Sequence, residues 1–160
     1  ASQFSAALGA AGLGATCRAG LQALKREHAA AVRPRDSRRL TGSVDFEAAH
    51  AASEPSANFW DYGVGLRLTN REEVAVWVEV HPASSTASVD AMIAKKRWLQ
   101  QKLEDYESLG TLTERARACA MDTYVWIATQ GTVSFGPGST HAQKLASAGI
   151  TMPKRYVDLP

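Results

Sequence analysis

The alternation of apolar and polar positions is clearest within Phe59–Ala83. Along residues 74–81, valines occupy every second position, and the positions between them include Trp77, Glu79 and His81. Successive side chains of a strand point to opposite faces. The pattern therefore predicts a strand with apolar residues on both faces, which is typical of the centre of a sheet. Glu79 would leave this strand as a buried carboxylate, which needs a partner because an unpaired buried charge is costly.

A second strand precedes this one, and residues 69–71 predict the turn that joins them. Pairing outward from the turn sets Leu68 opposite Glu72 and Asp61 opposite Glu79. Directly opposed side chains lie about 5 Å apart at Cβ, and two carboxylates so close repel unless a proton or a cation separates them. The register thus predicts paired acids at one end of the sheet, although a slip of one residue would turn Asp61 to the other face. Two solvated acids are the alternative.

Helical spacing of apolar residues predicts two longer helices. The first covers Arg18–Val32, with Glu27 beside its apolar stripe. The second runs from Val89 towards Gly110, a residue suited to the C-terminal cap. Further strands are predicted at residues 43–48, 124–128 and 132–135, and a short helix at residues 141–148.

Two lysines stand on the second predicted helix close to its apolar arc. Lys96 lies near the middle of the arc and Lys95 at its edge. Lysine stems often cover apolar surface while the ammonium group stays in water. The helix directly follows the strand of Glu79, however, so its first turns must pass the carboxyl end of that strand, where sites in open α/β sheets tend to lie.

Composition sets broad limits on the kind of protein. A chain of 160 residues with 45% hydrophobic content is typical of one folded domain, residues 1–160, and argues against disorder. The small, glycine-broken segment 1–16 is expected to be poorly ordered. No stretch is long enough to span a membrane. Cys17 and Cys119 lack CxxC context, so we expect two reduced thiols in a cytoplasmic protein.

The charge pattern leaves the partner open. The net charge of +2 neither demands nor excludes a nucleic-acid partner. Four arginines form a basic connector, which is either a solvated loop or a contact for phosphate: Arg33, Arg35, Arg38 and Arg39. No glycine-rich phosphate loop, GxSxG, HxH or HExxH spacing occurs, which argues against nucleotide cofactors, serine hydrolysis and histidine-based metal sites.

The predicted order is helix, three strands, helix, strand and helix, with acids on the middle strands. This order resembles the PD-(D/E)XK nuclease superfamily over roughly residues 18–148. The resemblance implies a restriction-endonuclease-like core, an α/β fold with a mixed sheet and helices on both faces. The phrases FWDYGVG and WVEVHPAS also resemble segments of small bacterial proteins. They add nothing about function.

The resemblance also implies roles for individual residues. Asp61 and Glu79 take the places of the two acids that bind Mg²⁺ or Mn²⁺, and Glu27 that of an extra ligand on the opening helix. The superfamily's lysine, two residues after the second acid, is replaced here by His81. Lys95 or Lys96 could supply the amine from the following helix, with His81 as third metal ligand or proton shuttle.

The resemblance implies hydrolysis of phosphodiester bonds in nucleic acid, either DNA or RNA. Three alternatives stay open at this stage. One is an inactive module of the same fold that binds nucleic acid or a protein partner. Another is an interaction protein, possible as a homodimer, whose acids are surface charges. The last is a different metal enzyme that uses His50 or His81. Trp60, Tyr62 and Trp98 are expected to pack in the core rather than stack on bases.

Overall fold

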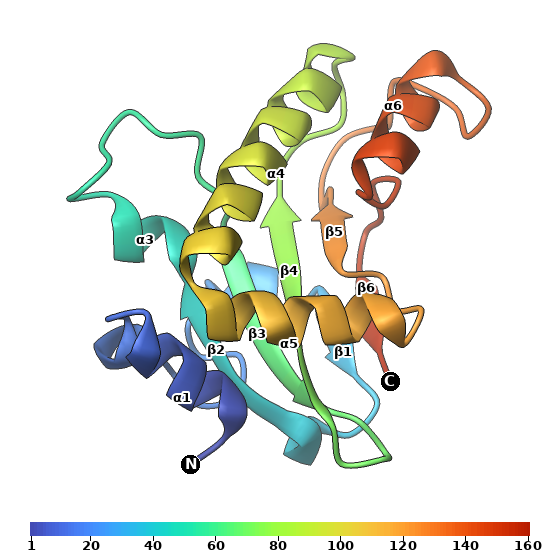
Figure 1. Cartoon of the computed structure of the whole chain (residues 1–160). Coiled ribbons are helices and arrows are strands. Elements are labelled where there is room, and N and C mark those ends of the chain that lie inside the picture. The colour runs from blue at the N-terminus through green and yellow to red at the C-terminus, as the bar shows by residue number, and fades with distance from the viewer.

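A computed structural model describes residues 1–160 as a mixed α/β fold built on a four-stranded sheet (Figure 1). The helical elements are α1 (Gln3–Ala10), η1 (Gly14–Thr16), α2 (Arg26–Ala29), η2 (Ser37–Arg39), α3 (Phe46–His50), α4 (Ala87–Asp105), α5 (Glu107–Ala118) and α6 (Thr140–Ala148). The strands are β1 (Val32–Pro34), β2 (Leu40–Asp45), β3 (Tyr62–Arg67), β4 (Glu73–Val80), β5 (Tyr124–Ile127) and β6 (Val157–Leu159).

The main sheet has the order β2-β3-β4-β5. The first three strands are antiparallel neighbours, and β5 returns parallel to β4 after the chain has passed through α4 and α5. Strands β1 and β6, from distant parts of the chain, form a separate parallel pair. A parallel neighbour needs a long crossover, which explains why both long helices stand between β4 and β5.

The register of the β3–β4 hairpin is the one predicted from the sequence. Tyr62 pairs with Val78, and the Leu68 amide donates to the Glu72 carbonyl at 2.7 Å. Counting one residue further places Asp61 opposite Glu79. The alternation of side chains along these strands therefore holds up to the end of the sheet.

Two apolar layers cover the two faces of the sheet. On one face Trp77, Val44 and Trp126 pack with α1, α4 and α5, which lie in front of the sheet in Figure 1. On the other face the valines of β4 pack with Leu24 and with β1 and β6. The resemblance predicts helices on both faces, but the second face is covered mainly by irregular chain and the small β1–β6 pair.

Two glycines of β3 make room for the layer of helices. A Cβ on Gly63 would stand 2.6 Å from the ring of Trp77, and one on Gly65 would stand 2.5 Å from the ring of Phe4. Both rings are fully buried. These aromatic residues therefore lie directly on the backbone of β3, on the face that also carries Asp61.

The predicted helix at Arg18–Val32 is wrong. Only α2 is helical within this range, and Val32 begins β1. Backbone amides in this range donate to the sheet instead of to a helix. The Arg18 amide donates to the Ser43 carbonyl at 2.9 Å, and the Ala23 amide donates to the Ser43 hydroxyl at 3.1 Å. Contacts with the sheet override the helical spacing of the apolar residues here.

The long helix predicted to end at Gly110 is interrupted earlier. Tyr106, with φ −99° and ψ 75°, separates α4 from α5, and the chain turns so that α5 crosses in front of the sheet (Figure 1). Gly110 lies inside α5, where a Cβ would meet the Leu103 carbonyl oxygen at 2.6 Å. This glycine permits the close turn between the two helices rather than ending one.

Two strand predictions also need correction. The strand at 43–48 is shifted, because β2 ends at Asp45 and the carboxylate of Asp45 caps α3 by accepting from the Ala48 amide at 2.9 Å. No strand forms at 132–135. The position beside β5 is taken instead by the later segment around Ile150 and Lys154, which makes parallel bridges with it. Strand β5 and helix α6 themselves agree with the prediction.

The first residues form helix α1, where the sequence analysis expects poor order. Phe4 and Leu8 are fully buried in the layer that includes Trp77. Burial of two large apolar side chains anchors the helix against the sheet. No helix of the structure is both long and apolar enough to cross a membrane.

Candidate functional site

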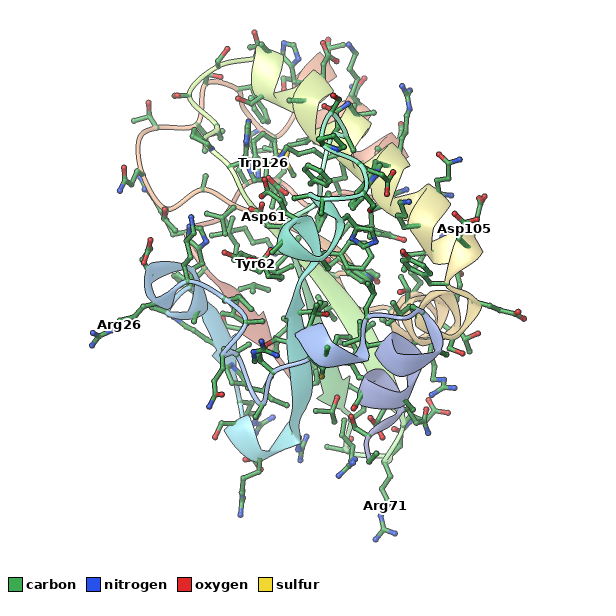
Figure 2. The ribbon with its side chains drawn as sticks, turned by 90° about the vertical axis from the view of Figure 1, so that its left-hand side faces the viewer. Arg26, Asp61, Tyr62, Arg71, Asp105 and Trp126 are labelled. Carbon is green, nitrogen blue, oxygen red and sulfur yellow. The ribbon has the colours of Figure 1, made fainter.

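The end of the β3–β4 hairpin brings two acids together. The two strands separate there, and each carboxylate accepts a backbone amide from the neighbouring strand. Glu79 Oε1 accepts from the amide of Asp61 at 3.0 Å, and Asp61 Oδ2 accepts from the amide of Val80 at 3.0 Å. Figure 2 shows Asp61 far from Arg71, which lies in the turn at the opposite end of the hairpin. The paired acids predicted from the register are thus adjacent.

Helix α4 brings a lysine to the same place. The ammonium of Lys95 lies 2.9 Å from Glu79 Oε2 and donates to the carbonyl oxygen of Phe59 at 3.1 Å. The Glu79 side chain is only 1% exposed, whereas that of Lys95 is 22% exposed. The lysine therefore stands between the buried acid and solvent.

Burial dominates the electrostatics of the pair. Desolvation raises the pKa of Asp61 to about 6, although the hydrogen bond from Val80 and the charge of Lys95 oppose this shift. Desolvation, together with the negative charge of Asp61, raises the pKa of Glu79 to about 8, against the opposing effect of Lys95. Near neutral pH the pair of acids therefore holds about one proton, mainly on Glu79. A cation bound between the two carboxylates could replace that proton.

Glu47 is a third acid near this place that the sequence analysis did not identify. After desolvation, its negative charge contributes to the raised pKa of Asp61. Glu47 lies in the first turn of α3, which begins at Phe46 because Asp45 caps it. The cap offered a signal, since Asp before a first-turn Glu is typical of a helix start. The predicted strand at 43–48 concealed it.

His81 follows Glu79 on the same strand and is half-buried. Its backbone continues the ladder with β5 by donating to the Ile127 carbonyl at 3.0 Å, and its ring centroid lies 6.5 Å from that of Trp126. Burial, and then the charge of Lys95, lowers the pKa of His81. Neither ring nitrogen has a hydrogen-bond partner within the chain. A neutral imidazole could accept a proton, but His81 does not form a three-ligand metal group with Asp61 and Glu79.

Three other predicted contributors lie elsewhere. Glu27 is exposed on α2 and makes no hydrogen bond or ion pair, because the helix that was expected to carry it inward does not form. Lys96 points away from the acids into a cleft lined by α5 and α6. His50 is occupied structurally, since its ring nitrogens bond the Phe46 carbonyl at 2.7 Å and the Tyr106 hydroxyl at 2.8 Å.

The arginine connector does not contact the acids. Arg38 and Arg39 precede Leu40, which pairs with Leu66 at the far end of β3. The length of β2 therefore separates them from Asp61, about 15–20 Å at the rise of a strand. Arg33 stacks on Tyr156, with its guanidinium carbon 3.4 Å from the ring centroid.

The aromatic residues behave as predicted for a core. Trp60 is fully buried and Tyr62 is 3% exposed. Trp98 is half-buried and packs edge-on against Phe46 and Phe59. Trp60 and Tyr62 are therefore not free to stack on a base.

The number of protein ligands at the acid pair limits which metal ion could bind there. The chain contains no group of three or more His, Cys, Asp or Glu side chains arranged to enclose a metal ion. Mg²⁺ commonly keeps several waters and uses only one or two carboxylates together with substrate phosphates. The two carboxylates therefore suit Mg²⁺ or Mn²⁺ bound with water and substrate, and do not suit a metal held by protein ligands alone.

Comparisons with known proteins leave this geometry as the main guide to function: no protein-family model, no curated protein and no solved structure matches the chain.

Proposed function

We propose that the protein hydrolyses phosphodiester bonds of nucleic acid in a reaction that depends on Mg²⁺ or Mn²⁺. The observation that carries this proposal is the convergence of Asp61, Glu79 and Lys95. Two acids face each other across neighbouring strands, and the lysine ammonium lies 2.9 Å from the second acid. Two acids and an amine are the set that the PD-(D/E)XK resemblance leads us to expect, with the amine supplied by the helix.

The arrangement of elements adds support. In the resemblance, a helix precedes three strands, and a second helix leads to a fourth strand. Here α1 precedes β2, β3 and β4 in an antiparallel run, and α4 leads through α5 to β5 beside β4. Asp61 directly precedes the second strand of this run, and Glu79 lies near the end of the third. We therefore propose a restriction-endonuclease-like core, with α1 rather than residues 18–32 as its opening helix.

Each side chain has a defined task in the proposed reaction. Asp61 and Glu79 hold the metal, which when bound lowers the pKa of a water molecule and neutralises charge on the scissile phosphate. Lys95 orients the attacking water and stabilises negative charge that develops on the phosphate. His81, kept neutral by burial, accepts a proton at a ring nitrogen. Glu47 contributes negative charge on the solvent side of Asp61.

The test is an incubation with single- and double-stranded DNA and RNA in Mg²⁺, Mn²⁺ or EDTA. We expect cleavage in metal only, reduced on the order of 100-fold or more in Glu79→Gln and in Lys95→Met. Lys25→Met, which removes a charge from an exposed lysine on the other face, should cleave normally. Absence of cleavage in both metals, or cleavage unchanged by Glu79→Gln, would contradict the proposal.

One observation favours a second candidate, an inactive module of the same fold that binds nucleic acid or protein. Glu79 is almost fully buried, its Oε1 accepts from the Asp61 amide, and its Oε2 forms an ion pair with Lys95. Such a pair could serve only to close the end of the hairpin. Binding of a nucleic acid without cleavage in either metal would support this candidate and exclude hydrolysis.

A further inference from the structure

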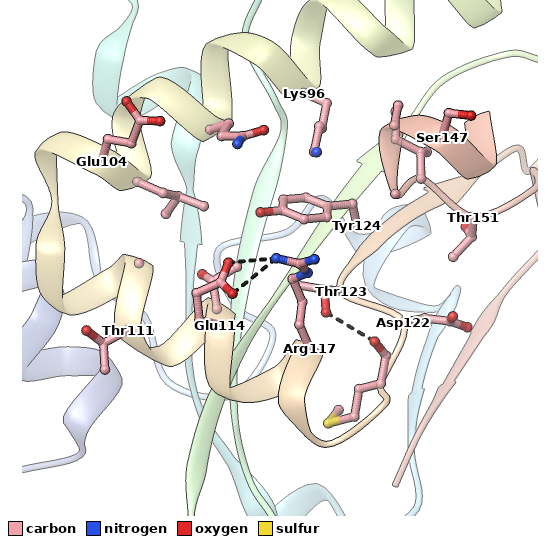
Figure 3. A pocket seen from close by; sticks show the side chains of 18 of the residues that line it. Lys96, Glu104, Thr111, Glu114, Arg117, Asp122, Thr123, Tyr124, Ser147 and Thr151 are labelled. Carbon is pink, nitrogen blue, oxygen red and sulfur yellow. Dashed lines mark hydrogen bonds and ion pairs between the residues drawn. The ribbon is translucent and has the colours of Figure 1, made fainter. Parts of the chain in front are cut away.

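A separate cleft lies between α4, α5 and α6, beside the start of β5, and has a volume of about 1000 Å³ (Figure 3). Neither Asp61 nor Glu79 nor Lys95 lines it. Its volume matches the upper range of small-molecule sites. The lining is mostly polar, so a ligand would be recognised by charge and hydrogen bonds.

Lys96 projects into this cleft from α4 (Figure 3). Its ammonium lies 4.9 Å from the centroid of the Tyr124 ring and makes no ion pair or hydrogen bond. Burial, followed by the positive charge of Arg117, lowers the pKa of Lys96. A half-buried ammonium without an acceptor is costly, and an anion placed beside Lys96 would reduce that cost.

No acid of the cleft forms an ion pair with Lys96, although the negative charge of Glu114 acts on it from a distance. Glu114 accepts two hydrogen bonds from one nitrogen of Arg117, at 3.0 and 3.1 Å. Asp122 pairs with Lys154 at 3.1 Å. The remaining two, Glu104 and Glu107, are exposed. Lys96 is therefore the one lysine or arginine lining the cleft that has no acceptor.

The lining of the cleft itself carries four acids against two cations, and a neighbouring groove of about 750 Å³ between α4 and α6 adds positive charge on the other side of Lys96. The two cavities share Lys96, Gln100, Ser147 and Ala148. The groove adds the cations Arg97 and Lys144 against a single acid, Asp90, which pairs loosely with Lys144 at 3.6 Å. Lys96 thus stands where two cavities meet, with further positive charge on the side away from the acids of α5.

We propose that this cleft binds a small ligand through a carboxylate or phosphate group held by Lys96, with the more distant positive charge of Arg117 in support. The hydroxyl of Ser147 is exposed at the shared edge, and that of Thr151, which accepts from the Trp126 amide at 3.1 Å, can still donate. Gly149 has no side chain to crowd the ammonium, since even a Cβ there would stand 3.9 Å from it. This site is independent of the proposed phosphodiesterase reaction.

The test is titration of the intact protein with inorganic phosphate and, separately, with citrate. Binding is followed by calorimetry and by amide chemical shifts in NMR, where residues of the cleft such as Tyr124 and Gly149 should move. We expect Lys96→Met and Arg117→Met each to weaken binding by about tenfold, which corresponds to about 1.4 kcal/mol. Arg117→Met lies in α5 and changes no residue of α4, so it tests the cleft without altering the helix that carries Lys95. Lys25→Met serves as the charge-matched control.

The outcomes separate clearly. Stronger binding of phosphate identifies a phosphorylated ligand, and stronger binding of citrate identifies a carboxylated one; either supports the site if the two variants weaken it. The proposal is overturned if neither probe binds, or if Lys96→Met and Arg117→Met bind as tightly as Lys25→Met. Shifts confined to residues outside the cleft would also overturn it.

Discussion

Lys95 and Lys96 are neighbours on α4, yet their side chains point into two different environments. Lys95 reaches the paired acids at the end of the β3–β4 hairpin, where its charge lies 2.9 Å from Glu79. Lys96 lies over the ring of Tyr124 in a cleft without an acceptor. Successive residues of a helix point about 100° apart, so a helix that crosses a sheet can supply two separate sites from adjacent positions.

The contrast shows how burial acts on charge with and without a partner. At the acid pair, the buried carboxylate of Glu79 has the ammonium of Lys95 in contact with it. The charge of Lys95 partly offsets the rise in the pKa of Glu79 that desolvation causes. In the cleft, desolvation and the charge of Arg117 lower the pKa of the Lys96 ammonium, and only the more distant charge of Glu114 opposes this shift. We therefore expect the first site to be sensitive to mutation and pH, and the second to respond mainly to added ligand.

The largest stability effect is expected for Lys95→Met at high pH. Without the ammonium, Glu79 must keep its proton or remain as an uncompensated buried charge. We expect a loss of about 2 kcal/mol at pH 9 but less than about 1 kcal/mol at pH 5, where Glu79 is neutral in both proteins. Urea unfolding at the two pH values measures this. A loss that is equal at both would show that only packing was removed.

The second effect is the pH dependence of the wild-type protein. The pKa values of Asp61 and Glu79 are raised to about 6 and about 8, so the native state holds protons that the unfolded chain releases near pH 4. Their contribution to stability is full below pH 4 and is lost as the pH rises through 6 and 8.

The comparison for this effect is Glu79→Gln, which should show a flatter stability curve above pH 7. Three histidines with lowered pKa values, the buried His50 and the half-buried His28 and His81, act in the opposite sense, but only below about pH 6.5. Parallel curves for the two proteins between pH 7 and 9 would show that Glu79 does not titrate there.

A smaller effect is expected for Asp61→Asn in metal-free buffer at pH 8. The amide oxygen can still accept from Val80, while repulsion with Glu79 disappears. We expect stability to rise by about 1 kcal/mol. Added Mn²⁺ should raise the melting temperature of the wild type but not of this variant. A lower melting temperature of the variant without metal would count against the repulsive pair.

The smallest effect is expected for Lys96→Met. No ion pair is lost, so stability should change by less than about 0.5 kcal/mol at either pH 5 or pH 9. Phosphate or citrate should raise the melting temperature of the wild type more than that of the variant. A pH-dependent loss like that of Lys95→Met would erase the distinction between the two lysines.

Local patterns of the sequence were enough to predict the acid pair. A short turn and strict alternation determine the register of a hairpin, and Asp61 faces Glu79 as that register requires. The same type of argument failed for Glu27, because a helical spacing of apolar residues does not fix a helix when sheet acceptors can take its amides. Glu47 was missed for a related reason, since the point where β2 becomes α3 depends on one capping bond.

The sequence by itself determined the central hairpin, its facing acids and the presence of two lysines on the following helix. Only the tertiary structure decided that Lys95 meets Glu79 and that Lys96 enters the cleft. Helical periodicity gives the angle between two side chains, but the position of α4 relative to β4 depends on packing against α5 and α6. That packing joins residues distant in the chain, and no local pattern encodes it.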